Sequence, residues 1–166
     1  MIFKRQSAIT GHNLVQCQNS TCDGDWIQFG HSCLKLYSTA GNFDAAQAIC
    51  QNSSSQLVEI DSLAKEKFIE SSVLSSSILD YWIGLKDVNN DNKLSSYKWV
   101  TSNRSVVSIG YSNWGTGLSS SSDNNCTALM QLILNTWGWL EKKCQEKYFF
   151  ICQSGIMGCK IYDIAL

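Results

Sequence analysis

Residues 80–85 read DYWIGL, a run of bulky apolar side chains near the middle of a chain of 166 residues. The run is short and rich in aromatic and β-branched residues, and a glycine and a nearby aspartate stop it. These features are typical of a buried strand. The sequence therefore predicts that residues 80–85 form a strand of the core.

Three elements are predicted before this strand. Residues 22–37, CDGDWIQFGHSCLKLY, alternate bulky and polar side chains around a turn that contains glycine, which predicts a strand hairpin. Residues 42–50, NFDAAQAIC, predict a helix with Asn42 as its N-cap, and residues 56–60 predict a short strand. Helical spacing places three residues on the buried face of the helix: Phe43, Ala46 and Cys50.

A second helix is predicted over residues 61–74, directly before the buried strand. Its N-cap is either Asp61 or Ser62, because both side chains can accept a hydrogen bond from a free backbone N–H of the first turn. Ala64 and Phe68 are expected on its apolar stripe.

A long region rich in Asn, Ser and Gly follows the buried strand, over about residues 86–125, and is broken only by residues 97–100 and 109–114. A loop region of this length in a compact domain is usually functional. Three closely spaced strands are then predicted, the last two joined by the short connection QEK: residues 126–133, 136–144 and 148–152. Helices precede most strands, which predicts an α+β fold.

The composition favours one folded domain and excludes two classes of partner. The length predicts a single domain, over residues 17–159, with a mobile N-terminal leader (residues 1–16) and a C-terminal tail (residues 160–166). The net charge of −1 attracts neither nucleic acid nor an anionic membrane, and the alternating charges of EKKCQEK (residues 141–147) indicate a solvated face. No stretch approaches the ~20 apolar residues of a membrane span.

The cysteine pattern favours an extracellular, secreted protein. Eight widely separated cysteines predict four disulfides formed in an oxidising compartment, whereas His12 and His31 are not spaced as zinc ligands. The first 17 residues hold no apolar segment of a signal peptide, so such a signal lies outside this sequence or export is unconventional. Four N-x-S/T motifs fit a glycoprotein: Asn19, Asn52, Asn103 and Asn125.

Five segments, in order, resemble the long form of the C-type lectin-like domain. CDGDWIQFGHSC (residues 22–33) is similar to the opening hairpin of that family, with Asp23 where the family usually has proline. FDAAQAIC resembles the first helix, WIGL is identical to the central motif, and Cys126, Cys144 and FFIC complete the pattern. The resemblance covers about residues 22–153 and implies a C-type lectin-like fold, in which two helices flank small antiparallel sheets beside a long loop region stapled by disulfides.

The resemblance also implies which cysteines pair. It implies three bonds inside the domain: Cys22–Cys33, Cys50–Cys152 and Cys126–Cys144. Cys17 and Cys159 lie just outside the matched region, and the first and last strands of this family pair, so an intrachain Cys17–Cys159 bond is expected first. The alternative is an interchain bond, so the chain is a monomer or a disulfide-linked dimer.

Sugar-binding members of the family hold a calcium ion in the long loop, and such an ion needs six to eight oxygen ligands. The loop here reads NWGTGLSSSSDNNC (residues 113–126) and lacks the Glu-Pro-Asn or Gln-Pro-Asp triplet of that site. Three oxygen ligands remain as candidates, namely Asp123, Asn124 and Glu141. We expect the usual sugar-binding calcium site to be absent or weak.

A second calcium site of the family lies beside the first and is matched more closely here. KDVNNDN (residues 86–92) places Asp87 and Asp91 at positions that the resemblance assigns to metal ligands, with Asn124 and Asn125 from the other loop. The same residues also fit a solvated turn in which Asp and Asn side chains bind the backbone. Calcium is therefore the one cofactor that the sequence leaves open.

Aromatic side chains in the long loop region could bind a sugar by stacking. Tyr111 and Trp137 are the candidates for ligand contact, together with Asp123 and Glu141, whereas Trp114 and Trp139 are expected in the core.

The sequence contains no catalytic motif such as G-x-S-x-G or H-E-x-x-H, so we expect a binding protein and not an enzyme. Two functions remain. The first is a secreted module that binds glycans in innate defence or cell-surface recognition, with a degenerate calcium motif. The second is a lectin-like module that binds a protein ligand without calcium.

Overall fold

The computed structural model describes residues 6–10, 13–17, 21–74, 79–115, 125–132, 136–155 and 159–163. Side chains are described from residue 21 to residue 155 within these ranges. The predictions for Asp123 and Asn124 lie outside the described residues.

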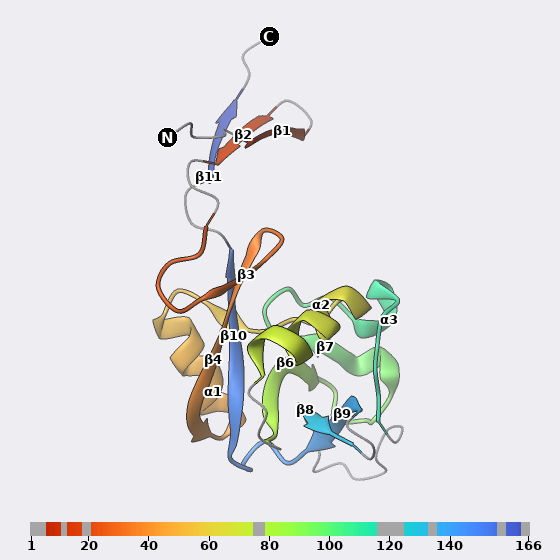
Figure 1. Cartoon of the computed structure of the whole chain (residues 1–166). Coiled ribbons are helices and arrows are strands. Elements are labelled where there is room, and N and C mark those ends of the chain that lie inside the picture. Colours follow the sequence, from red (N-terminus) through yellow and green to blue (C-terminus); the bar gives the residue numbers. More distant parts are fainter. Residues whose placement is uncertain are drawn as a thin grey trace.

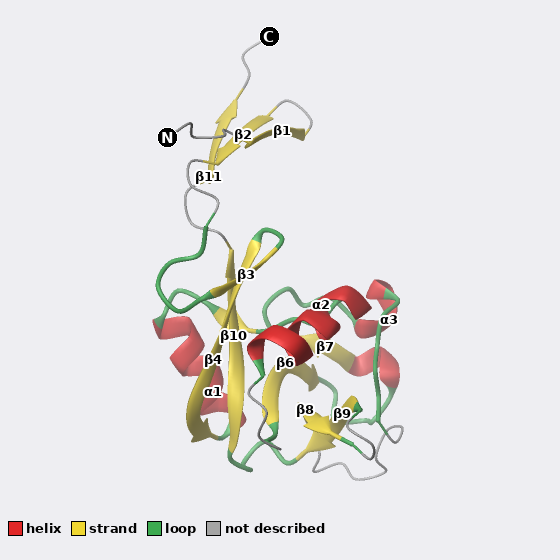
Figure 2. Cartoon of the chain, viewed as in Figure 1, coloured by secondary structure: helices red, strands yellow, loops and turns green. Residues whose placement is uncertain are grey.

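The main sheet has eight strands, in the order β3-β4-β10-β6-β8-β9, with β5 paired to β10 and β7 to β6 (Figures 1 and 2). The strands are β3 (Ile27–Phe29), β4 (Ser32–Gly41), β5 (Gln56–Leu57), β6 (Tyr81–Asp87), β7 (Tyr97–Trp99), β8 (Cys126–Gln131), β9 (Trp137–Lys142) and β10 (Tyr148–Gly155). All pairs are antiparallel except β10 with β6, so the sheet is mixed where antiparallel sheets were expected. The α+β prediction is confirmed.

The WIGL segment lies in β6 at the centre of this sheet and is fully buried, as predicted. Successive side chains of a strand point to opposite faces. Tyr81 and Ile83 accordingly join one apolar cluster, while Trp82 joins the other. The strand thus supports two cores, one on each face of the sheet.

Gly84 is required in β6 by a close approach of β5. A Cβ atom at this position would lie 2.8 Å from the carbonyl oxygen of Leu57, well inside van der Waals contact. The backbone N–H of Gly84 donates to Val58 at 2.9 Å, and its carbonyl accepts from Val100 at 2.8 Å. The glycine of the motif therefore lets three backbone segments meet.

Helix α1 (Phe43–Asn52) covers one face of the sheet and matches its prediction. The Asn42 side chain accepts from the backbone N–H of Ala45 at 2.9 Å, which makes it the N-cap. The buried residues are those predicted: Phe43, Ala46 and Cys50.

Helix α2 (Leu63–Phe68) continues into the π-helical turn η1 (Ile69–Val73) and differs from its prediction on one point. Ser62 is the N-cap, but Ala64 is exposed and Phe68 only half-buried. The buried residues are Lys65, Glu66, Ile69 and Val73. The predicted apolar stripe was wrong at Ala64, whereas Phe68 packs against the core. Two charged residues of this helix are buried instead, because they find hydrogen-bond partners inside the domain.

The chain ends form a separate three-stranded sheet, in the order β1-β2-β11 (Figure 1). Its strands are β1 (Gln6–Thr10), β2 (Asn13–Cys17) and β11 (Cys159–Asp163). Strands β1 and β2 lie at the N-terminal end and β11 at the C-terminal end, where the sequence analysis placed the leader and the tail. The resemblance to the family had led us to expect that the first and last strands pair.

Three disulfides tie the main sheet together, with the pairings that the resemblance implies. They are Cys22–Cys33, Cys50–Cys152 and Cys126–Cys144, with Cα–Cα distances of 5.6, 5.5 and 5.2 Å. In the terminal sheet, Cys17 and Cys159 are directly opposite each other in the β2–β11 register. Their side chains lie outside the described part of the chain, so their bond stays a prediction.

Candidate ligand-binding site

Asp87 ends β6 and organises the turn that follows it. Its side chain is fully buried, and Oδ1 accepts from the backbone N–H groups of Asn89 and Asn90, both at 3.0 Å. Oδ2 accepts from the backbone N–H of Asn92 at 2.7 Å. These three bonds stabilise the turn. They agree with the interpretation of this segment as a turn in which Asp and Asn side chains bind the backbone.

Asp91 lies on the outer side of the same turn. Oδ1 accepts from the backbone N–H of Lys93 at 3.0 Å, and Oδ2 lies 3.3 Å from the Lys93 ammonium. The hydrogen bond from Ser96, followed by that from the Lys93 backbone, lowers the pKa of Asp91. This carboxylate is therefore ionised and paired within its own turn.

Among the described residues, the oxygen atoms around this turn do not form a complete calcium site. Two buried side-chain oxygens, Oδ1 of Asn92 and Oδ1 of Asn125, have no hydrogen-bond partner and are ligands of the right chemistry. However, the carboxylate oxygens of Asp87 already accept from backbone donors. Within the described ranges, no three His, Cys, Asp or Glu side chains group in a way that could hold a metal ion.

A polar surface hollow beside Asn125 carries positive charge. It lies between the first turn of α1 and the end of β6, and Lys86 and Lys143 contribute to its wall together with Asn90. The Lys86 ammonium lies 5.9 Å from the centre of the Phe43 ring. The two ammonium groups on the wall of this hollow disfavour a divalent cation in it.

Glu141 lies on β9 and points into the domain. Only 8% of the residue is exposed, and its carboxylate accepts a short hydrogen bond from the Tyr97 hydroxyl. Burial, together with the neighbouring carboxylate, raises the pKa of Tyr97. Glu141, which was predicted from the sequence to contact a ligand, thus accepts a hydrogen bond from β7 instead.

Glu66 of α2 is a buried acceptor for several polar side chains, and its role was not predicted from the sequence. Its carboxylate is fully buried and accepts from the Tyr111 hydroxyl at 2.9 Å, from the Trp139 indole at 3.1 Å and from the Asn113 amide. Burial raises the pKa of Glu66, although these three donors favour its charged form. No local pattern reveals the site, because every donor lies at least 45 residues away.

The two aromatic candidates mainly support the core. Tyr111 is half-buried and packs edge-on against Trp139 with ring centres 5.8 Å apart, in addition to its bond with Glu66. Trp137 is also half-buried and packs against Tyr81 at 5.9 Å. Trp139 is fully buried, as predicted, and Trp114 packs against the same cluster.

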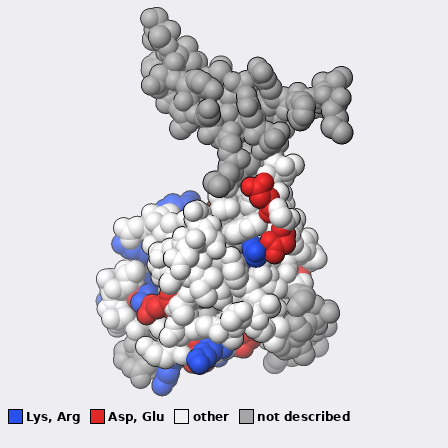
Figure 3. Space-filling model, turned by 90° about the vertical axis from the view of Figure 1, so that its left-hand side faces the viewer, with Lys and Arg blue, Asp and Glu red and all other residues white. Residues whose placement is uncertain are grey.

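Charged side chains are sparse on one face of the molecule. The face in Figure 3 is mostly uncharged, and its Lys and Arg side chains lie in small separate groups. Among the described residues, no helix is both long enough and apolar enough to cross a membrane.

Comparison with known proteins identifies the family. The family model described as "Lectin C-type domain" matches residues 39–154, which is more than half of the chain. The chain is 28% identical over 143 residues to C-type lectin domain family 4 member G of Mus musculus, covering 84% of this chain and 46% of that protein. The chain thus spans about half the length of this relative.

Solved structures share the fold. The C-type lectin domain of murine dendritic cell inhibitory receptor 2 superimposes with a TM-score of 0.70 at 23% identity, covering 81% of this chain and 99% of the other. A calcium-independent type II antifreeze protein gives 0.66 at 21%, covering 82% and 96%. With the family match, the WIGL strand at the sheet centre and three disulfides in place, the chain belongs to the C-type lectin family.

Proposed function

We propose that this chain is an extracellular recognition module that binds glycans, and that calcium contributes little to this binding. Family membership supports a binding role over a catalytic one. Two structures of similar fold were determined with glycans, the murine dendritic cell inhibitory receptor 2 domain in complex with an N-glycan and the cow CD23 domain in the presence of a GlcNAc2Man3 oligosaccharide. The disulfides support an extracellular location, since such bonds persist in oxidising compartments.

The observation that carries the calcium part of the proposal is the inward engagement of two carboxylates. Asp87 accepts three backbone N–H bonds, and Glu141 accepts from Tyr97. A calcium ion that bridges protein and sugar needs such oxygens free at the surface. The antifreeze protein described as calcium-independent supports the view that this fold functions without the ion.

A second candidate is a module that binds a protein ligand without calcium. The same engagement of Asp87 and Glu141 favours it, because Asp87, a candidate of the second calcium site, and Glu141, a candidate of the sugar site, already accept hydrogen bonds within the domain. The test must therefore separate glycan binding from calcium dependence.

A glycan array, probed with the full chain in calcium and again in EGTA, tests the proposal. We expect binding to at least one glycan class, with signals that EGTA reduces by no more than about twofold. The chain with Cys50 and Cys152 both changed to Ala, which lacks one disulfide of the domain, serves as the control for binding by unfolded protein. Absence of binding in both buffers would exclude the glycan proposal and favour the protein-binding candidate.

A further inference from the structure

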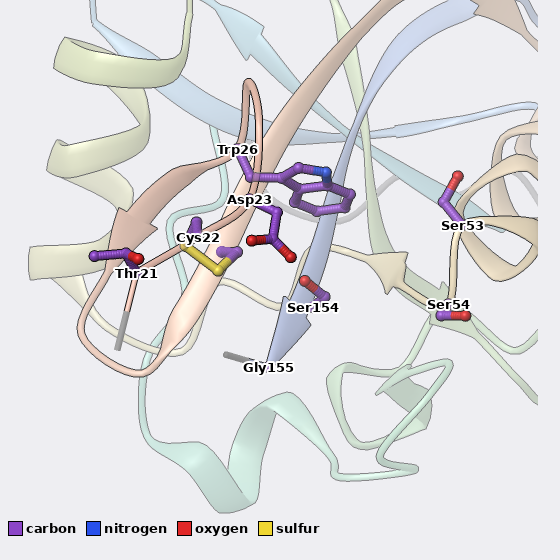
Figure 4. Close-up of a pocket in the computed structure, with 9 residues that line it drawn as sticks. Thr21, Cys22, Asp23, Trp26, Ser53, Ser54, Ser154 and Gly155 are labelled. Atoms are coloured by element: carbon purple, nitrogen blue, oxygen red, sulfur yellow. A yellow bond between two sulfur atoms is a disulfide. The ribbon is translucent and has the colours of Figure 1, made fainter. Parts of the chain in front are cut away.

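A small pocket lies at the C-terminal end of α1, while the polar hollow beside Asn125 lies at its N-terminal end. Segments from three parts of the chain meet there: the residues before β3, the turn after α1 and the end of β10 (Figure 4). The Cys22–Cys33 disulfide forms part of the wall, and the cavity volume is ≈ 90 Å³. The disulfide and the paired strands β4 and β10 hold the pocket in shape.

The polar side chains of this pocket have unused hydrogen-bonding capacity. Within the described part of the chain, five of them make no side-chain hydrogen bond: Thr21, Asp23, Trp26, Ser54 and Ser154. Ser53 differs, because its hydroxyl is 3.0 Å from the Tyr37 hydroxyl. In Figure 4, Trp26, Asp23 and Ser154 lie around one side of the pocket, and Ser53 and Ser54 lie on the other.

Trp26 provides the apolar wall and is held in place from outside the pocket. It is half-buried, and the Lys35 ammonium lies 5.9 Å from the centre of its ring. Lys35 is itself paired with Asp25 at 2.9 Å. The cation–π contact and the ion pair fix the orientation of the indole before any ligand arrives.

This set of groups has the chemistry of a sugar site that needs no metal. An indole ring packs against the C–H groups of a pyranose, while its N–H end remains polar. The Asp23 carboxylate accepts from sugar hydroxyls, and the Ser54 and Ser154 hydroxyls donate or accept as required. The Asp23 charge repels an acidic sugar, and the small volume admits only part of one ring.

We propose that this pocket is a second glycan subsite, which binds the terminal residue of a neutral sugar chain without calcium. The inference rests on the proposed function and adds to it a place and a class of sugar. It also gives the chain polar and aromatic groups for a saccharide at a place away from Asp87 and Glu141, whose carboxylates accept hydrogen bonds within the domain.

NMR titration of the full chain in EGTA tests the subsite directly. The probes are the methyl glycosides of mannose, galactose and N-acetylglucosamine, with N-acetylneuraminic acid as the acidic comparison. We expect at least one neutral glycoside to shift the indole N–H signal of Trp26, which disappears in Trp26→Phe and is thereby assigned. Asp23→Ala should weaken that glycoside about tenfold, and Ser154→Ala should weaken it less.

Asp44→Asn is the matched control, because Asp44 is an exposed acidic residue at the other end of α1 that does not line the pocket. It should bind as the wild type does, and circular dichroism should show that every variant is folded. If the array is positive but neither the Trp26 signal nor the Asp23→Ala affinity changes, the subsite is excluded and the proposed function stands. If the array and the titration are both blank, both proposals fail.

Discussion

The indole N–H of Trp139 donates a hydrogen bond of 3.1 Å to the buried carboxylate of Glu66, across 73 residues of sequence. Tyr111 and Asn113 donate to the same carboxylate. Helix α2 is therefore fastened to β9 and to the segment that leads into the long loop. Removing the carboxylate would leave three buried donors without an acceptor.

Glu66→Ala is accordingly expected to lower the free energy of unfolding by about 3 kcal/mol, since each unsatisfied buried donor is costly and a cavity is added. Urea denaturation measures the change. Lys67→Ala is the control on the same helix, because Lys67 makes only an exposed ion pair with Glu70, and it should have little effect. Equal stability of the two variants would contradict the role given to Glu66.

The raised pKa of Glu66 has a consequence for the pH dependence of stability. In the folded state its pKa lies above the ordinary value of 4.5, so the folded chain binds this proton more tightly than the unfolded chain does. The protonated Glu66 side chain therefore contributes to the free energy of unfolding. This contribution is fully present below pH 4.5 and is lost as the pH rises through the pKa of Glu66 in the folded state. The free energy of unfolding of the wild type, relative to Glu66→Gln, should increase as the pH falls through this window; a decrease would contradict the assignment.

Gly84→Ala tests the close approach of β5 to β6. The new Cβ would lie 2.8 Å from the Leu57 carbonyl oxygen, which belongs to the backbone and cannot turn away. We expect a loss of about 2 kcal/mol in unfolding free energy, as for other overpacked cores. Gly41→Ala is the control, because its nearest neighbour would be the Ala45 Cβ at an ordinary 3.5 Å. Comparable stability of the two variants would contradict the crowding at Gly84.

Features set by nearby residues could be predicted from the sequence. The strand at WIGL and the helix capped by Asn42 each depend on a few adjacent side chains, and both are where they were expected. The burial of Glu66 was not predicted, because charged residues in a helix usually indicate a face exposed to solvent. Its distant partners cannot be recognised from the sequence around it. Its burial depends on Tyr111, Asn113 and Trp139, which only the folded chain brings together.

The turn after β6 shows a different limit. The sequence DVNND suits a calcium loop and a turn organised by Asp87 equally well, because both use carboxylate and amide oxygens. The difference lies in whether those oxygens face backbone N–H groups or one another. The order of residues does not show which way these oxygens face. The three hydrogen bonds that Asp87 accepts show that its oxygens face backbone N–H groups.

The paired positions of Cys17 and Cys159 in β2 and β11 predict an intrachain disulfide. Directly opposite residues of antiparallel strands have Cα atoms about 4.5–5.5 Å apart, within the range of a disulfide. We expect a monomer on non-reducing electrophoresis and a peptide that joins both cysteines in mass spectrometry. Cys17→Ser should expose one alkylatable thiol, at Cys159. A covalent dimer that disappears in Cys17→Ser would establish the interchain alternative instead.

Calcium should stabilise this domain very little, because the Asp87 carboxylate is already satisfied by three backbone N–H groups. A ligand that binds only the folded state raises the melting temperature, so a thermal scan in calcium and in EGTA measures binding directly. We expect the two scans to agree. Asp87→Ala should lower the free energy of unfolding by about 2 kcal/mol in either buffer, since the turn loses its acceptor. Asp91→Ala, which removes an exposed carboxylate of the same turn, should change stability little. A calcium-dependent rise in melting temperature that both variants abolish would instead make the turn a metal site, and glycan binding would then have to be tested again as a calcium-dependent process.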